Sequence, residues 1–433
     1  MQLQAETFNE PASTRVAAVD TIDPSTTSGI RLHYIDSLRG LAALAVVILH
    51  AFEMFGLGLG WAGIVSDARL TGGLDKIIPF LYNNLVGWGA MAVEMFIVLS
   101  GYSLMIGVAR SQDGRPKGGL RAYFLRRIRR IWPPYYAALF VSLAIILIIP
   151  GMNQKANVYW DLALPVTFDS VAGHLLFLQH LNPGWFFKIN PPMWTVAIEE
   201  WIYVLFPFLL LPIWRRFGSL VMVAVAVVLG VGAWYLFPSL LQSANPWYLG
   251  LFALGALGAS IGFSHGREQR LSKRLPWLKL SLGLLLLFVV LTELFQRVDL
   301  HLGDITWFTD LIFGVGILCL LVHYTELWKA RIPLRKTSFL RVLNQPALIG
   351  LGRFSYSLYL LHTPVLALVA LLIRQSGLVS LPAYLTILVL GVPVAVACAY
   401  LFHRVFERPF MSGQSAQSAV KHEGVEASAA AQL

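Results

Sequence analysis

Residues 38–57 read LRGLAALAVVILHAFEMFGL, an apolar run of twenty residues with only three ionisable side chains, Arg39, His50 and Glu53. A helix of this length is about 30 Å long, which matches the hydrocarbon core of a bilayer. The run therefore predicts a membrane-spanning helix rather than an element of a soluble core.

Further runs of this kind follow along the chain. They lie at 86–107, 134–150, 194–213, 219–238, 246–263, 277–296, 306–323, 350–373 and 383–403. Of the 433 residues, 57% are hydrophobic and 13% charged, whereas a soluble domain has about 25% charged residues. Because backbone groups in lipid must bond within their own segment, each run is expected to be helical. The predicted fold class is all-α, a polytopic membrane bundle of about ten transmembrane helices.

The distribution of Lys and Arg predicts the orientation of this bundle. With ten spans and both termini cytoplasmic, all but six of the 33 basic residues lie on the inside. The six on the outside are Arg69, Lys76, Lys155, Lys188, Arg297 and Arg374. This positive-inside bias accounts for the net charge of +10 without a nucleic-acid partner. The lipid bilayer is the partner that the composition indicates.

Three segments are expected along the chain. Residues 1–33 form a polar cytoplasmic segment, residues 34–410 the transmembrane domain, and residues 411–433, rich in Ala, Ser and Gln, a disordered cytoplasmic tail. The two cysteines, Cys319 and Cys398, lie inside apolar runs, so neither a disulfide framework nor a metal site is predicted. Nothing in the sequence indicates an oligomeric state.

Arg39 and His50 lie on one face of the first predicted helix. Eleven residues correspond to about 16.5 Å of rise and about three turns. Arg39 would lie at the cytoplasmic end and His50 near or beyond the middle of the bilayer. An intramembrane histidine is by default a candidate functional residue. The alternative is a structural histidine bonded to a neighbour such as Glu53.

The second predicted span carries Glu94 and then Ser100-Gly101 near its inner end. Glu94 and Gly101 are seven residues apart and share a face. The small pair would let a helix or a ligand approach the backbone closely. The plainer interpretation of Glu94 is a buried carboxylate paired with a basic side chain of another span.

A dense basic cluster precedes the third span, at Arg121, Arg126, Arg127, Arg129 and Arg130. Positive-inside anchoring is one explanation. The other is a phosphate site, because Arg127 and Arg130 are about one turn apart and guanidinium groups bind phosphate oxygens well. Coenzyme A, with its pyrophosphate and 3′-phosphate, would be such a ligand.

The fourth span opens with Pro191-Pro192-Met193-Trp194, and then carries Glu199 and Glu200. Thr195, Glu199 and Tyr203 recur at four-residue spacing and so share a face. Adjacent carboxylates cannot share that face, and Glu199 is predicted to be the one directed into the bundle.

His362, in the ninth span, is a second histidine deep in the membrane. Ser355 and Tyr359 lie on its stripe, while Arg353 lies on the opposite face. A packed, hydrogen-bonded structural role is the alternative for His362.

The outer loop at about 151–193 is the longest, and its aromatic residues include Tyr159 and Trp185. It is expected to fold at the membrane interface. Its aromatic side chains would either stack on carbohydrate or anchor the loop at the interface.

Taken in order, these motifs resemble the acyltransferase family 3 of multi-span membrane O-acyltransferases. The matching segments are Tyr34 to His50, Glu94 to Tyr102, Arg127 to Pro133, Trp194 to Tyr203, Ser355 to His362 and Phe406 to Phe410. The departures are Thr195 and Ala197 in place of serines, and Ile202 in place of an aromatic residue. Family members often carry an appended SGNH-type domain, which is expected to be absent here.

The resemblance implies an acyl-CoA donor at the inner face and a carbohydrate or other hydroxyl acceptor at the outer side. The expected activity is O-acyl transfer, with acetyl-CoA as co-substrate and no metal, in a bacterial inner membrane. Arg39, Arg127 and Arg130, with Ser100 and Gly101, would bind the cofactor. His50 would act as a general base or a transient acyl carrier.

The remaining residues have less specific expected roles. Glu199 would orient His50 or bind the sugar together with Trp194, and Glu94 would pair with Arg39 or another neighbour. His362 is a further catalytic candidate. Arg39, Ser100 and Tyr359 are candidates for stabilising the oxyanion, and Tyr359 also for binding substrate. Two other functions stay open, a proton-coupled transporter that uses the intramembrane His and Glu residues, and a non-catalytic scaffold.

Overall fold

The computed structural model describes residues 32–54, 74–156, 158–241, 243–264, 267–297, 306–330, 338–378 and 380–411. These residues form helices joined by turns and loops, and no strand occurs among them. The predicted all-α class is therefore confirmed. The segments expected at 1–33 and 411–433 lie almost wholly outside the described residues.

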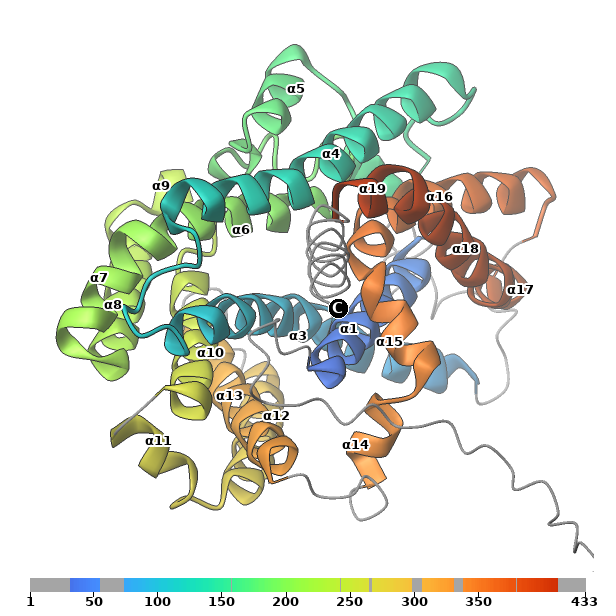
Figure 1. Ribbon diagram of the computed structural model, residues 1–433. Coiled ribbons are helices and arrows are strands. Elements are labelled where there is room, and N and C mark those ends of the chain that lie inside the picture. The colour runs from blue at the N-terminus through green and yellow to red at the C-terminus, as the bar shows by residue number, and fades with distance from the viewer. Residues whose placement is uncertain are drawn as a thin grey trace, which may run out of the picture. The chain divides into compact units, whose positions relative to one another are not determined.

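The helices follow one another along the chain as labelled in Figure 1. The first half holds α1 (His33–Glu53), α3 (Leu74–Ala109), α4 (Gly119–Ile148), η1 (Tyr159–Ala163), α5 (Phe168–Leu175), η2 (Gln179–Leu181), α6 (Met193–Leu205), η3 (Phe206–Leu210), α7 (Leu211–Phe217), α8 (Ser219–Leu236) and α9 (Pro238–Leu241). The second half holds α10 (Tyr248–Phe263), α11 (Arg267–Ser272), α12 (Trp277–Arg297), α13 (Thr306–Lys329), α14 (Ser338–Leu343), α15 (Pro346–Arg353), α16 (Ser355–Gln375), α17 (Ser380–Thr386), η6 (Ile387–Gly391), α18 (Val392–Phe402), η7 (His403–Glu407) and α19 (Arg408–Met411).

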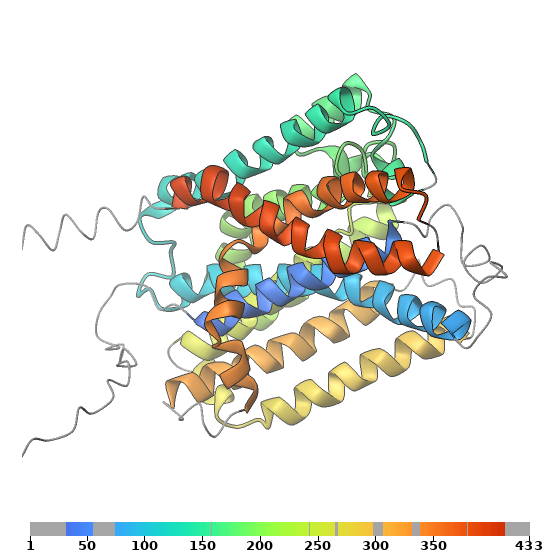
Figure 2. The ribbon, with the colours of Figure 1, turned by 90° about the vertical axis from the view of Figure 1, so that its right-hand side faces the viewer.

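Among the described residues, nine helical segments are long and apolar enough to cross a membrane. They run roughly side by side in Figure 2. The remaining predicted span corresponds to α10, which has 16 residues and is buried along its whole length. The protein is therefore an integral multi-pass membrane protein.

Many large apolar side chains lie on the outside of the bundle. Leu147 is 77% exposed, Leu220 70% and Leu286 65%. In a membrane protein the surface around the spans faces lipid tails, which are as apolar as leucine. These exposed residues therefore indicate the lipid-facing surface.

The helix α10 packs against α3 more extensively than any other two elements pack together. Glycines permit this closeness, because a Cβ at Gly255 would lie 1.9 Å from the Val98 carbonyl oxygen, and one at Gly101 2.0 Å from that of Phe252. Close backbone approach at small residues is a common way for membrane helices to associate. Gly101 therefore faces α10.

Several predicted boundaries differ from the structure, and two of these differences affect the site. The third span was expected to begin at 134, but α4 begins at Gly119 and continues through Pro133 and Pro134, so the arginine cluster lies within the helix. The ninth span was expected to be continuous from 350, but the helix breaks at Phe354 between α15 and α16. Membrane helices tolerate proline because neighbouring groups satisfy the freed carbonyls.

The expected outer loop is folded, with three short helices between α4 and α6. His174 and His180 are buried in it. Burial disfavours the charged imidazolium and lowers the pKa of each to about 4. Both histidines are therefore neutral at pH 7, where they support the fold of the loop.

Candidate active site

A cavity lies between α1, α3, α4, α6 and α16, and it holds about 950 Å³ of empty space, including the part that opens outward. Its lining residues are Arg39, Phe96, Ile97, Ser100, Ser103, Leu104, Arg127, Arg130, Ile131, Thr195, Val196, Glu199, Tyr203, Ser355, Tyr356 and Tyr359. The lining combines apolar side chains with a few polar and charged groups, as small-molecule sites do. Most of the residues singled out in the sequence thus meet in one space.

One end of the cavity is basic. Arg39, Arg127 and Arg130 line it together. Helical spacing predicted a shared face for Arg127 and Arg130, and the family resemblance added Arg39 to them. Arg39 Nη2 lies 3.1 Å from Ser103 Oγ, to which it donates a hydrogen bond. The Arg127 guanidinium lies 5.8 Å from the centre of the Tyr203 ring, within range of a cation–π contact. Within the described ranges, no carboxylate oxygen lies within 4.0 Å of these three guanidinium groups.

Glu199 lines the wall of the cavity, as predicted from the helical phase of α6. Ser100 Oγ donates a hydrogen bond to Glu199 Oε1 over 2.5 Å, and the Tyr203 hydroxyl donates another. Glu200 lies outside the lining, and its Oε2 accepts a hydrogen bond from Trp132 Nε1 at 3.3 Å. The two hydroxyl donors hold the Glu199 carboxylate at the cavity.

A hydrogen-bonded group closes the end of the cavity away from the arginines. Thr195 Oγ1 donates to the Tyr359 hydroxyl over 2.7 Å, and that hydroxyl donates to the Pro192 carbonyl over 3.1 Å. The Phe96 ring lies edge-on to the Tyr359 ring at 5.9 Å. Tyr359 is therefore fixed at the boundary of the cavity.

The two deep histidines lie beyond this boundary and contact each other. His50 Nδ1 lies 2.7 Å from His362 Nε2, and the rings are stacked with their centroids 5.0 Å apart. His362 is itself next to Tyr359, with ring centroids 5.9 Å apart. The histidine pair is thus one aromatic ring away from the cavity.

The outer loop covers the other side of His50. The Tyr159 hydroxyl of η1 lies 3.1 Å from His50 Nε2, and the two rings are stacked at 4.6 Å. Glu53 Oε2 lies 3.8 Å from the same nitrogen. His50 therefore contacts one span, one loop and the carboxylate one turn along α1.

Three other predicted site residues lie outside the cavity. Glu94 is buried and pairs with Asp310 of α13, whose Oδ2 accepts a hydrogen bond from Trp247 Nε1 at 2.7 Å. The expected Glu94–Arg39 pair is not formed, because Arg39 turns to the carbonyl of Leu99 and to Ser103. The others are Gly101, packed on α10, and Trp194, stacked on Phe186 at 4.8 Å.

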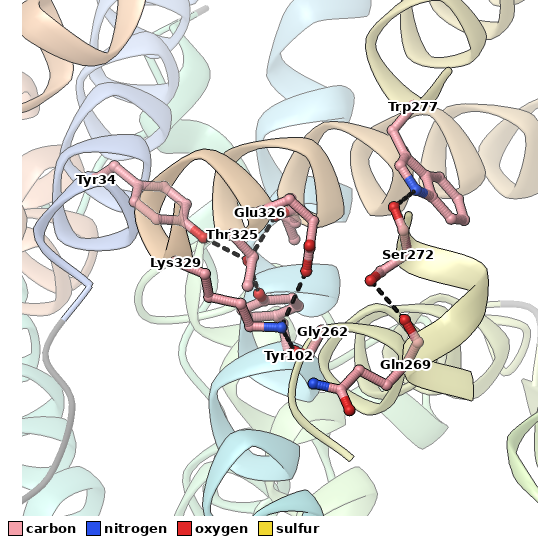
Figure 3. Close-up of polar contacts among 10 residues, drawn as sticks. Tyr34, Tyr102, Gly262, Gln269, Ser272, Trp277, Thr325, Glu326 and Lys329 are labelled. Carbon is pink, nitrogen blue, oxygen red and sulfur yellow. Dashed lines mark hydrogen bonds and ion pairs between the residues drawn. The ribbon is translucent and has the colours of Figure 1, made fainter. Parts of the chain in front are cut away.

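A buried polar group supports the basic end of the cavity (Figure 3). Thr325 Oγ1 donates to the Leu321 carbonyl at 2.7 Å, and it accepts hydrogen bonds from the Tyr34 and Tyr102 hydroxyls. These three residues tie α1, α3 and α13 together. Because Tyr102 immediately precedes Ser103, the group fixes the helices where Arg39 meets Ser103.

Several contacts of the site are not predicted by the sequence. Asp310 and Ser103 lie in no charged cluster and in no recognisable motif, and Tyr159 is predicted only as an aromatic residue of the outer loop. The spacing of Ser103 from Ser100 on the same helix face is a usable signal. The position of Tyr159, in contrast, depends on the fold of the loop.

Comparisons with known proteins agree with this site. A family model described as an acyltransferase domain, acyltransferase 3, matches residues 32–404. A protein named "Putative O-acetyltransferase" from Staphylococcus aureus strain COL is 24% identical over 389 residues, which cover 87% of this chain and 56% of that protein. The O-acetyltransferase OatA from Staphylococcus aureus strain NCTC 8325 / PS 47 is 23% identical over 374 residues, covering 79% of this chain and 57% of OatA.

No solved structure matches this chain. The chain spans about half the length of the curated relatives it matches. The family match covers most of the chain, and it includes α1 with Arg39 and His50 as well as α16 with His362. The chain therefore belongs to the acyltransferase 3 family.

Proposed function

We propose that this protein is a membrane O-acyltransferase that moves an acetyl group from acetyl-CoA to a hydroxyl of a carbohydrate acceptor. One observation carries the proposal. A cavity lined by three arginines is bounded by Tyr359, and behind this ring lie His362 and then His50. His50 Nε2 faces a hydroxyl. One helical bundle thus holds both a candidate site for the phosphates of the donor and a candidate general base.

The donor would enter at the basic end. Arg39, Arg127 and Arg130 offer charge-assisted hydrogen bonds to the phosphates of coenzyme A, and no carboxylate within the described ranges competes for them. The pantetheine arm would follow the cavity past Ser100 and Glu199. For transfer, the thioester would move past Tyr359 and reach the side of His50 that carries Nε2.

The acceptor hydroxyl would bind at His50 Nε2, at the position marked by the hydroxyl of Tyr159. His50 takes the hydroxyl proton as general base, and the freed oxygen attacks the thioester carbonyl carbon. A C–O ester bond forms and the C–S bond breaks. The proton on His50 passes to the sulfur of the departing coenzyme A, so that atoms and charges balance.

The orientation of the bundle fits this division of substrates. The positive-inside bias of Lys and Arg supports an orientation in which the basic end of the cavity faces the cytoplasm, where acyl-CoA would be available. The acceptor would reach His50 from the opposite side, beneath the outer loop. In a bacterium this membrane would be the inner membrane, and the acceptor a surface or exported glycan.

Two further features support acetyl as the transferred group and a carbohydrate as the acceptor. The relatives bear the name O-acetyltransferase. Trp194 stacks on the buried Phe186 of the outer loop, and an indole ring held in this way is a flat apolar surface of the kind to which sugars bind. The Thr195–Tyr359 hydrogen bond bounds the cavity at the end away from the arginines, which suits a small acyl group.

Mass spectrometry of cell-envelope glycans tests this function. Glycans from a strain expressing the protein and from a deletion strain would be compared, with deletion strains complemented by wild type or by His50→Ala. We expect one or more acetyl mass increments that disappear on deletion and return only with the wild-type chain. Identical glycan masses in all four strains would contradict the proposal.

A proton-coupled transporter is the second candidate, and the buried Glu94–Asp310 pair favours it. Two adjacent buried carboxyl groups cannot both ionise, so the pair holds a proton in the membrane. A transporter would leave acetyl-CoA unconsumed. Transfer of radiolabel from acetyl-CoA to glycan separates the two functions.

A further inference from the structure

The two deep histidines are not equivalent in their surroundings. His362 is fully buried, with 0% of its surface exposed, and its Nε2 lies 2.7 Å from His50 Nδ1. The side chain of His50 keeps 12% exposure, and its second nitrogen, Nε2, faces the Tyr159 hydroxyl. One histidine therefore lies behind the other, as seen from the outer loop.

The backbone determines which nitrogen of His362 carries hydrogen. Its Nδ1 lies 3.0 Å from the Leu358 carbonyl oxygen, and a carbonyl oxygen only accepts hydrogen bonds. His362 Nδ1 must therefore be an N–H. Because a neutral imidazole has one N–H, His362 Nε2 is a bare acceptor, and the hydrogen in the short contact belongs to His50 Nδ1.

The neutral state of His362 follows from what surrounds it. The ionisable groups facing the pair are Glu53 on α1, Tyr159 on η1 and Tyr359 on α16. Within the described ranges, no carboxylate lies within 4.0 Å of His362. A buried imidazolium without a counter-ion is costly, so the His362 ring rests uncharged.

From this geometry we infer that His362 is a positioning residue that fixes His50 in the tautomer with its lone pair on Nε2. That lone pair then points to the site of the acceptor hydroxyl. This inference rests on the proposed acyl transfer. When His50 Nε2 takes the acceptor proton, His362 Nε2 goes on accepting from His50 Nδ1–H, which stabilises the imidazolium without gaining the proton itself.

The direction of this series of hydrogen bonds means that His50 and His362 cannot exchange roles. The path runs from the Leu358 carbonyl through His362 to His50 and ends at a hydroxyl. His362 has no lone pair left to act as a base. The same logic governs the buried residue behind the histidine of hydrolytic triads, where the wrong tautomer costs up to about 10⁴ in turnover.

Membrane vesicles from expressing cells supply the assay, with radiolabelled acetyl-CoA as donor and the glycans of the vesicles as acceptor. The variants are His362→Gln, His362→Leu and His50→Gln. The control is His323→Gln on α13, which changes a histidine outside the site. Each is compared at equal protein level for kcat, for the KM of acetyl-CoA and for the pH profile.

His362→Gln keeps an acceptor oxygen near the position of Nε2, and we expect it to retain kcat within about tenfold of wild type. His362→Leu removes the acceptor, so kcat should fall by about 10²–10⁴ with KM for acetyl-CoA unchanged. Since the imidazolium loses its partner, the acidic limb of the pH profile moves to lower pH. His50→Gln should be inactive.

Three results would overturn the inference. These are equal activity of His362→Gln and His362→Leu, an unmoved acidic limb in His362→Leu, or an active His50→Gln beside an inactive His362→Gln. If the His362→Leu protein does not accumulate, the comparison of His362→Gln with His50→Gln still shows which histidine is the base, because only substitution of the base abolishes activity. Absence of acetyl transfer by wild type would instead contradict the proposed function.

Discussion

Ser100 of α3 and Glu199 of α6 meet across the cavity, with the serine hydroxyl 2.5 Å from the carboxylate oxygen. Two spans almost a hundred residues apart are thus joined at the cavity that the arginines line. The Tyr203 hydroxyl donates to the same carboxylate oxygen. Glu199 Oε1 therefore accepts hydrogen bonds from both Ser100 and Tyr203.

Removing the Glu199 carboxylate should impair activity more than neutralising its charge. Glu199→Ala leaves the hydroxyls of Ser100 and Tyr203 without a partner. At about 1.5–3 kcal/mol for a hydrogen bond to a charged group, we expect a 10- to 100-fold loss of acetyl transfer. Glu199→Gln should retain more activity, because its amide oxygen still accepts. Glu200→Gln, which changes the adjacent residue outside the cavity, is the control, and an equal loss there would refute a specific role.

The basic end of the cavity makes a second prediction. Arg127→Ala combined with Arg130→Ala should weaken binding of acetyl-CoA to the purified protein by several kcal/mol, at about 1.5–3 kcal/mol for each contact. Titration calorimetry in detergent measures the affinity. The matched control, Arg126→Ala with Arg129→Ala, removes the same charge from the same helix but from residues that do not line the cavity. Equal affinities of the two double variants for acetyl-CoA would indicate that Arg127 and Arg130 serve only to orient the protein in the membrane.

Thr325 should matter for stability. Thr325→Val keeps the shape of the side chain but removes the acceptor of two buried tyrosine hydroxyls. The cost should be about 1–3 kcal/mol, measured by unfolding with SDS in mixed micelles. Thr292→Val is the control, because the hydrogen bond that Thr292 makes within the described residues runs to the Phe288 carbonyl of its own helix. A Thr325→Val chain as stable as this control would show that the three-helix contact contributes nothing.

Acid should weaken the fold of the outer loop. The pKa of His174 falls to about 4 in the folded protein, against an ordinary value of 6.5. The unfolded chain therefore binds this proton first, and stability is lost as pH falls from about 6.5 toward 4, by up to about 1.4 kcal/mol per pH unit. His174→Asn removes the ionisation, so its thermal midpoint should depend less on pH than that of wild type. Parallel midpoints between pH 7 and pH 5 would contradict this interpretation.

Helical phase is enough to predict much of the site. The spacing along each helix assigns Arg39, Arg127, Arg130 and Glu199 to inward faces, and all four line the cavity. The reason is physical, since charged side chains in a span avoid lipid and so face the interior of the bundle.

Partners across helices cannot be predicted in this way. Glu94 was expected to pair with Arg39 or another neighbour, and helical phase could not tell that the neighbour is Asp310. Gly101 serves the α3–α10 contact rather than the cavity. Periodicity gives the face of each helix, whereas the order of helices around it depends on packing of the whole bundle. Tyr159 reaches His50 only because the outer loop folds back over α1.

The central claim is that His50 carries out acyl transfer with acetyl-CoA as donor, and one measurement tests it most directly. Membrane vesicles containing wild-type protein, His50→Ala or the control His323→Ala would be given radiolabelled acetyl-CoA, and label in the glycan fraction counted over time. We expect wild type and His323→Ala to transfer label at similar rates, and His50→Ala to be slower by about 10²–10⁴ at equal protein level. Undiminished transfer by His50→Ala would contradict the claim.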